Sequence, residues 1–284
     1  MRRLRYVFAD VFTDTPLAGG NQLAVFTDAR DLDAFTMQQL AAEIGFAETV
    51  FVMSPTSPEA DVRIRIFTPE TELPFAGHPT LGTAFVLGGP MQKIRITIET
   101  EGGIVPVDLT REGSKITFGW MQQPIPGWQA FDSAIRLIRS FGQFEDPTCP
   151  VDLYHLGPKH IFVEFPSPEA VAALKPDFGL ISTLTSACVN CFAREGDGWK
   201  TRMFAPGSGV PEDAATGSAA GPLALHLARH GRINWGDTIR ISQGTEIGRP
   251  STLWAQVDGS ETQIDRILVG GSAVVVARGE YLIP

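Results

Sequence analysis

The chain has 284 residues and a mass of 30.7 kDa, with 43% hydrophobic residues, 19% charged residues and a net charge of −9. This composition excludes a disordered or fibrous protein, and because Lys and Arg are scattered singly, it argues against nucleic-acid binding. No run of about 18 uncharged apolar residues occurs, so a membrane span is excluded.

The N-terminal segment does not have the pattern of a secretion signal. Met1–Arg5 is basic, but Asp10 and Asp14 interrupt the stretch that would have to be apolar. The three cysteines are an odd number, which suits a reducing compartment better than a disulfide framework. We therefore expect a cytoplasmic protein.

Periodicity in the first half predicts strands and one surface helix. Residues 4–12 and 24–27 predict a β-pair, because a stretch rich in turn residues separates two apolar runs. The spacing of apolar residues over 36–44 predicts an amphipathic helix that begins at Thr36 and ends at Gly45. Alternating or β-branched segments predict further strands at residues 49–53, 61–67, 93–98, 104–109 and 115–120.

The second half repeats this order after a predicted linker at residues 122–127. Strands are predicted at 159–164, 187–193 and 199–204, a helix near 168–174, and a hairpin at Asp197-Gly198. Later strands are predicted at 238–242, 253–257 and 267–277. We therefore divide the chain into halves at 1–126 and 127–284, with a last strand that returns to the first half.

An internal repeat supports this division. Arg65, Phe67 and Pro69 recur at one constant spacing as Arg202, Phe204 and Pro206. The first segment leads to the turn Ala76-Gly77-His78, and the second leads to the turn Thr216-Gly217-Ser218. The chain is therefore interpreted as two copies of one unit of about 140 residues each.

Each copy places its Gly turn before a helix that is apolar on nearly every face. A surface helix would not tolerate the sequences of residues 81–87 and 223–228, so each helix is expected to be wrapped by its own sheet. Pro79 suits the first position of the first helix. Pro222 would lie one turn inside the second helix if Ser218 capped it, which predicts a slightly later start for that helix.

The first turn of such a helix is able to bind an anion, because its backbone N–H groups are unpaired and glycine lets a ligand approach. Gly77 and Gly217 occupy these positions, and two such turns facing each other would bind a carboxylate. The alternative for either turn alone is close packing of small residues. The duplication, together with nearby ionisable groups, favours a binding site.

Glu48 is the first of three ionisable candidates. It stands at the entrance of an apolar strand, where a carboxylate is costly, so its pKa is expected above the ordinary value of about 4.3. A carboxyl group with a raised pKa is able to take and return a proton near neutrality. Position alone favours the alternative, a glutamate that caps or pairs at a strand edge.

His78 and Asp213 are the other two ionisable candidates, each beside one Gly turn. His78 as a simple helix cap and Asp213 as a simple turn cap are equally good interpretations, since both roles are common. The sequence alone does not separate these roles from catalysis.

Cysteines and the other histidines predict no metal or redox site. Cys188 and Cys191 form a CxxC pattern, but they lie in a predicted strand with only Cys149 left over. His226 and His230 share a helix face, yet no third ligand is evident near them in the sequence. No metal is therefore expected.

Several of these segments together resemble a known family. They are residues 10–14 with Gly20-Asn21, the Glu48 segment, residues 65–69 leading to 75–79, and residues 212–222. Over nearly the whole chain they resemble the PhzF family of phenazine biosynthesis. One departure is Gln22 after Asn21, where the family usually has proline.

The resemblance implies a diaminopimelate-epimerase-like α/β fold. Two pseudo-symmetric domains would each wrap a curved sheet around a central apolar helix, with the site between them. By the family motif, Glu48 would transfer the proton with His78 and Asp213 as polar companions. The substrate contacts implied by the motif are Gly77, Thr216, Gly217 and Ser218. Related racemases carry a cysteine at each Gly turn; here His78 and Ser218 stand there, which excludes a two-thiol racemase.

The implied activity is the isomerisation of trans-2,3-dihydro-3-hydroxyanthranilate without a metal or organic cofactor, by a homodimer. Glu48 would move a proton from C3 to C1 of the ring, whose extended π-system disperses the developing charge. Two alternatives stay open: an isomerase or epimerase of another small amino or hydroxy acid, and a non-catalytic member that binds a metabolite.

Overall fold

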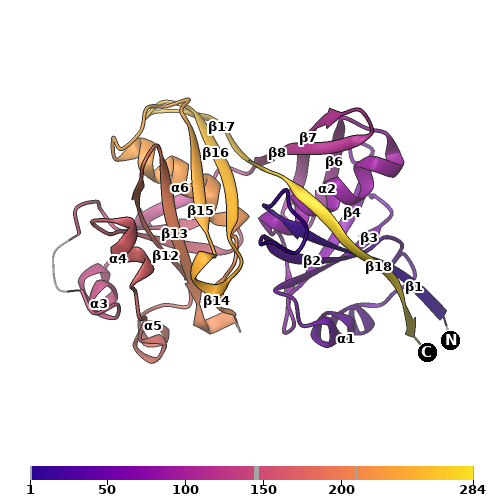
Figure 1. Ribbon diagram of the computed structural model, residues 1–284, viewed down its shortest axis with the longest axis horizontal. Helices are drawn as coiled ribbons and strands as arrows, with labels where there is room; N and C mark the ends of the chain where they lie inside the picture. Colours follow the sequence, from indigo (N-terminus) through magenta and orange to yellow (C-terminus); the bar gives the residue numbers. More distant parts are fainter. Residues whose placement is uncertain (1, 144–146, 209, 284) are drawn as a thin grey trace. The chain divides into compact units, whose positions relative to one another are not determined.

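The computed structural model describes residues 2–143, 147–208 and 210–283 (Figure 1). Residues 1 and 284, the outer ends of the predicted halves, lie outside the described residues. The chain forms two compact units: unit 1 is Met1–Gln122 with Gly270–Pro284, and unit 2 is Gln123–Val269. The domain boundary predicted between residues 126 and 127 stays a prediction.

Unit 1 is a curved sheet. Its strands are β1 (Arg2–Val11), β2 (Asn21–Phe26), β3 (Glu48–Met53), β4 (Val62–Phe67), β5 (Glu72–Leu73), β6 (Arg95–Thr100), β7 (Gly103–Glu112), most of β8 (Lys115–Gln123) and β18 (Ala273–Ile283). β1 pairs antiparallel with β2 and with β18, which comes from the far end of the chain (Figure 1). β2 is parallel to β3, β3 antiparallel to β4, β4 parallel to β6, and β6 antiparallel to β7.

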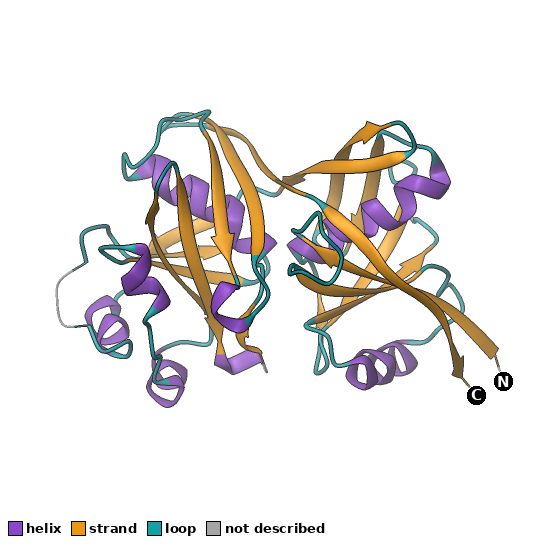
Figure 2. Cartoon of the chain, in the orientation of Figure 1, coloured by secondary structure: helices purple, strands orange, loops and turns teal. Residues whose placement is uncertain are grey.

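The central helix of unit 1 is α2 (Gly77–Met91), which contacts β1, β2, β3, β6, β7 and β18. Its positions from Gly77 to Val86 are all buried, so it has no polar face, as predicted. Strands surround it in the cartoon (Figure 2). A second helix, α1 (Ala34–Ile44), contacts β3 and β4. Gly45 ends α1 as predicted, but Asp33 rather than Thr36 caps its start by accepting a hydrogen bond from the Thr36 N–H.

Unit 2 repeats the topology of unit 1. Its strands are β9 (Gly127–Ala130), β10 (Asp152–His155), β11 (Lys159–Glu164), β12 (Cys188–Glu195), β13 (Gly198–Ala205), β14 (Val210–Asp213), β15 (Thr238–Gln243), β16 (Ser251–Gly259) and most of β17 (Ile264–Gly271). β11 is parallel to β12, β12 antiparallel to β13, β13 parallel to β15, and β15 antiparallel to β16. This is the order of pairings that β2, β3, β4, β6 and β7 make in unit 1.

The helices of unit 2 are α3 (Ala134–Arg139), α4 (Pro168–Ala172), α5 (Phe178–Leu184) and α6 (Gly217–Arg229). Every residue of α6 from Gly217 to Ala228 is buried, and the helix contacts β11 and β16. α6 is therefore the counterpart of α2, a central helix without a polar face. Among the described residues no helix is long and apolar enough to be a membrane span.

The repeat is visible in side-chain contacts as well. The guanidinium of Arg65 lies 5.2 Å from the centre of the Phe67 ring, and that of Arg202 lies 4.9 Å from the Phe204 ring. Each arginine also forms a two-point ion pair, Arg65 with Glu72 and Arg202 with Glu212. The recurring Arg-x-Phe sequence thus marks the same position on β4 and β13.

Three local predictions were wrong. α2 begins at Gly77, so Pro79 is its third residue, and α6 begins at Gly217 although Pro222 lies inside it. At Pro79 the missing N–H has no cost, because the first turn of a helix needs no intrahelical donor. Pro222 is the sixth residue of α6, so its ring leaves the Ser218 carbonyl without the donor that an i+4 residue normally supplies. The predicted hairpin between β12 and β13 is present, but it turns through Gly196 and Asp197, because Glu195 pairs with Gly198. The single strand predicted at 267–277 is split between β17 and β18.

Candidate active site

In unit 1 the structure brings Glu48 and His78 together. Glu48 is the first residue of β3, and His78 is the second residue of α2. The Nε2 atom of His78 lies 3.5 Å from Oε2 of Glu48, and no hydrogen bond joins these two atoms. The Glu48 side chain keeps 18% of its surface exposed, whereas that of His78 keeps 3%. A carboxylate that reaches solvent therefore rests against a buried imidazole.

Burial sets the charge of His78. Desolvation lowers the pKa of His78 to about 3, although a hydrogen bond with the backbone of Gln22 acts in the opposite direction. The imidazole is therefore neutral near pH 7. Its Nδ1 lies 3.2 Å from the amide nitrogen of Asn21, on β2. With this amide donating, Nδ1 is the acceptor and the ring hydrogen is on Nε2, facing Glu48.

Gly77 lies directly beside this pair, as the first residue of α2. Ala76 precedes it in an extended conformation and provides no side-chain cap. The backbone N–H groups at the start of α2 therefore have no side-chain acceptor from the N-cap residue, and they carry the positive end of the helix dipole. This is the arrangement that favours an anionic ligand.

In unit 2 the segment before α6 is held by one glutamine. Thr216 Oγ1 donates to the Asp213 carboxylate over 2.7 Å. Gln243, at the end of β15, donates from Nε2 to the Asp213 carbonyl and to Thr216 Oγ1, and its Oε1 accepts from the Thr216 N–H. Asp213 and Thr216 are thus fixed together, with Gly217 as the first residue of α6.

Ser218 is held by a histidine that the sequence analysis did not assign to the site. Its Oγ lies 3.0 Å from Nε2 of His160, on β11, and the amide of Asn190 lies 3.4 Å from the other ring nitrogen. Burial lowers the pKa of His160 to about 3, so this ring is also neutral near pH 7. The ring therefore orients the Ser218 hydroxyl without carrying charge.

The structure thus forms two groups from the predicted site residues. Unit 1 holds Glu48, Gly77 and His78, and unit 2 holds Asp213, Thr216, Gly217 and Ser218. Sequence reasoning missed three residues that position them: Asn21, His160 and Gln243. The internal repeat gave a signal for Asn21 and His160. Gly20 and Gly157 begin equivalent segments of the two halves, and Asn21 and His160 follow closely after them.

The CxxC pair shows no arrangement of a redox site. Cys188 and Cys191 both lie in β12, as predicted, and neither forms a disulfide. Burial raises the pKa of Cys191 well above its ordinary value, which keeps its thiol protonated. A reactive thiolate is therefore not expected at Cys191.

Comparison with known proteins gives a consistent result. Residues 9–279 match the sequence model of the PhzC-PhzF family, described as phenazine biosynthesis-like protein. The trans-2,3-dihydro-3-hydroxyanthranilate isomerase of Pseudomonas chlororaphis is 47% identical over 278 residues, which cover 98% of this chain and 99% of that protein.

Solved structures agree on the fold. A PhzF-family phenazine biosynthesis protein from Bacillus anthracis has a TM-score of 0.86 at 27% identity, covering 100% of both chains. A probable proline racemase from Agrobacterium radiobacter has a TM-score of 0.73 at 12% identity, with 99% of this chain and 93% of that one covered. The second similarity concerns the fold alone. Together they confirm the predicted diaminopimelate-epimerase-like α/β fold.

Proposed function

We propose that this chain, which belongs to the phenazine biosynthesis-like PhzC-PhzF family, isomerises trans-2,3-dihydro-3-hydroxyanthranilate to the aminoketone precursor of phenazines. The choice of substrate rests on the 47% identity, over nearly the full length, to the trans-2,3-dihydro-3-hydroxyanthranilate isomerase of Pseudomonas chlororaphis. At that coverage no domain of the relative is missing from this chain.

Glu48 is the proposed proton carrier. Its carboxylate is partly exposed and lies 3.5 Å from a neutral imidazole. On the side of His78 it therefore faces an uncharged ring and no solvent. A carboxylate in this setting accepts the C3 proton of the substrate and returns it at C1, which moves the double bond and leaves an enol that tautomerises to the ketone. One proton is removed and one is added while the electron pair stays in the substrate, so the step needs no oxidant or cofactor.

His78 is proposed to act on Glu48 as a neutral hydrogen-bond donor. A charged imidazolium would stabilise the carboxylate and lower its basicity, whereas a neutral ring with its hydrogen on Nε2 orients the carboxylate at a smaller cost in basicity. The N–H groups at Gly77, beside this pair, support a role in binding the substrate carboxylate.

The unit 2 residues are proposed as further substrate contacts. Thr216, Gly217 and Ser218 form the start of α6, and Asp213 is fixed against Thr216. Their hydrogen bonds to Gln243 and His160 support a preorganised surface, since each side chain has one defined orientation. A homodimer in the cytoplasm remains part of this proposal, by analogy with the family.

The test is incubation with trans-2,3-dihydro-3-hydroxyanthranilate in deuterated water. Loss of the diene absorbance together with deuterium at the new C–H position is the expected result, because a carboxyl group that exchanges with solvent delivers deuterium. If the substrate stays unchanged while an amino acid or hydroxy acid of similar size exchanges its α-hydrogen, the chain is instead an epimerase of that compound. If no compound is turned over, the catalytic proposal is wrong.

A further inference from the structure

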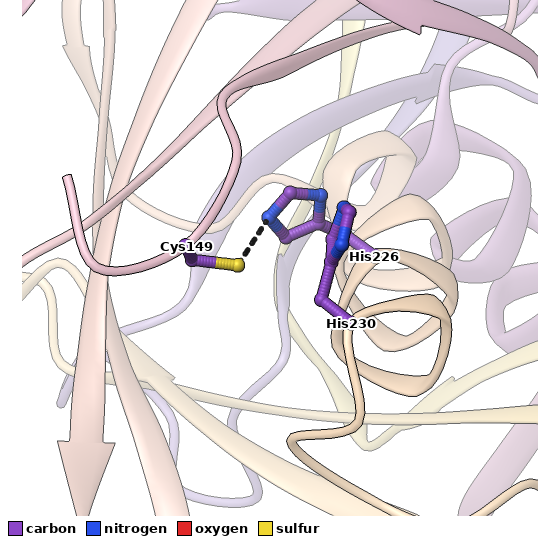
Figure 3. A group of neighbouring side chains, drawn as sticks. All are labelled: Cys149, His226 and His230. Atoms are coloured by element: carbon purple, nitrogen blue, oxygen red, sulfur yellow. Dashed lines mark hydrogen bonds between the residues drawn. The ribbon is translucent and has the colours of Figure 1, made fainter.

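A cysteine and two histidines meet at the C-terminal end of α6. His226 lies in the last turns of α6 and His230 follows its end, four residues later, while Cys149 comes from the segment before β10. One ligand atom from each of the three residues lies within 4.8 Å of the other two (Figure 3). The cluster combines residues that are far apart in the sequence, which is why no third ligand was evident from the sequence.

The spacing fits the ligand polyhedron of a zinc ion. Sγ of Cys149 lies 3.4 Å from Nε2 of His226. In a tetrahedral site with Zn–S of about 2.3 Å and Zn–N of about 2.0 Å, adjacent sulfur and nitrogen ligands are about 3.5 Å apart. Cys149 is 2% exposed and His226 is fully buried. The two atoms are therefore already held at a ligand-to-ligand distance in a protected position.

The second ring nitrogen of each histidine has the partner that a metal ligand needs. His230 Nε2 lies 2.9 Å from Oδ2 of Asp152, which leaves its Nδ1 for a metal. His226 Nδ1 lies 3.2 Å from the Tyr154 hydroxyl and 3.7 Å from the same Asp152 oxygen. Metal-binding histidines usually donate their other N–H to such a carboxylate or oxygen, which fixes the tautomer and the ring orientation.

The charges around the cluster permit a cation. Arg229 bonds Asp152 at 2.9 Å and lies over the Trp128 ring, and Arg232 bonds Glu164 at 2.6 Å. Both guanidinium groups are thus paired with carboxylates. Arg232 also hydrogen-bonds the Cys149 sulfur, a contact that a metal would displace on binding.

We propose that Cys149, His226 and His230 bind a zinc ion, with water as the fourth ligand. The thiolate and imidazole donors select zinc over magnesium or calcium. The ion would tie the segment before β10 to the end of α6, about 14 Å along the helix from Gly217. The site would stabilise unit 2 and take no part in proton transfer, so it stands independently of the proposed isomerase activity.

The test uses the full chain, freed of metal with a chelator and then titrated with Co²⁺ as a spectroscopic probe and with Zn²⁺ in competition. We expect one Co²⁺ per chain, a thiolate-to-cobalt charge-transfer band, visible bands of a tetrahedral complex, and displacement of Co²⁺ by Zn²⁺. The Cys149→Ser variant should lose the charge-transfer band, and His230→Gln should bind Zn²⁺ at least about tenfold more weakly. His226 is not replaced, because it lies in the core.

Cys188→Ser is the matched control, since it removes another thiol of unit 2 and should leave the band and the affinity unchanged. The Asp152→Asn variant should weaken Zn²⁺ binding by about 10- to 100-fold through its effect on His230. Absence of stoichiometric binding by the parent chain would overturn the proposal. So would a charge-transfer band that persists in Cys149→Ser or disappears in Cys188→Ser.

Discussion

Glu48 and His78 lie 3.5 Å apart without forming a charged pair, because burial keeps the histidine neutral near pH 7. A neutral partner leaves the carboxylate its basicity, which a proton carrier needs and a structural ion pair does not. This setting is compatible with the proposed role of Glu48 as a proton carrier, which stays a prediction.

Replacing Glu48 with glutamine should lower turnover by about 10²- to 10⁴-fold, the usual contribution of a general acid/base group. The amide fills the same space, so the melting temperature should change little. Steady-state kinetics and thermal unfolding measure the two effects. Glu43→Gln, at an exposed position of α1, is the matched control and should keep full activity. Near-normal turnover in Glu48→Gln would remove this residue from the mechanism.

Acid should destabilise the protein before the carboxylates titrate. His78 and His160 have a pKa of about 3 in the folded chain, whereas an unfolded histidine has a pKa of about 6.5. Above pH 6.5 or so their contribution to stability is complete, and it is lost as the pH falls toward about 3, because only the unfolded chain takes up the protons. At about pH 5 each histidine should cost about 2 kcal/mol.

Urea unfolding at about pH 7 and at about pH 5 tests this effect. The variant His160→Gln should show a smaller loss of stability between the two pH values than the parent chain, because one proton uptake is removed. His155→Gln, at the end of β10, is the matched control for replacing a histidine of unit 2. Equal pH dependence in the parent and in His160→Gln would contradict the assignment.

Two glycines of α2 should respond in opposite ways to alanine. A Cβ at Gly82 would come within 2.6 Å of both Leu23 and Val11, which are fully buried, so Gly82→Ala should destabilise the fold by about 1–3 kcal/mol. A Cβ at Gly89 would meet nothing within 4 Å, so Gly89→Ala should be neutral or stabilising by up to about 1 kcal/mol. Denaturant unfolding measures both. Equal effects would mean that α2 is not tightly enclosed.

The Arg202–Glu212 pair should matter far more than an exposed pair. Its side chains are 9% and 11% exposed, and Arg202 also donates to backbone carbonyls at the end of α4 and just beyond it. Arg202→Met leaves a buried carboxylate unpaired and should cost about 3–5 kcal/mol. Arg95→Met breaks the exposed pair with Asp108 and should cost less than about 1 kcal/mol. A similar loss of unfolding free energy in both variants would contradict the claim that burial makes the Arg202–Glu212 pair the more important one.

Much of the fold was predictable from the sequence, because the strongest signals are regular. The family resemblance and the fold class were both confirmed, and the apolar helices are enclosed as predicted. Helix starts were less certain, since Pro79 is acceptable at several positions of the first turn. Asp33 displaced Thr36 as the cap of α1 because its carboxylate reaches the Thr36 N–H from one turn earlier.

Only those residues of the candidate site that lie within the family motif segments could be predicted from the sequence. Glu48, His78 and Asp213 stand in the motif segments, and their catalytic roles remain predictions. His160 and Gln243 were missed because their importance depends on long-range contacts with Ser218 and Thr216, which no local pattern encodes. For the same reason, the proximity of Cys149 to His226 in the proposed zinc site could not be predicted from the sequence.

The pairing of β18 with β1 has a consequence for synthesis on the ribosome. Unit 2 is continuous in sequence and is complete in the nascent chain before any residue of β18 is made. Unit 1 is incomplete until β18 has been synthesised. β1 leaves the exit tunnel first, but the edge that pairs with β18 stays open until all of unit 2 has been made. An open strand edge of this length can pair with another chain. The order of translation therefore makes the N-terminal unit the one exposed to co-translational misassembly, and the one on which chaperones would be expected to act.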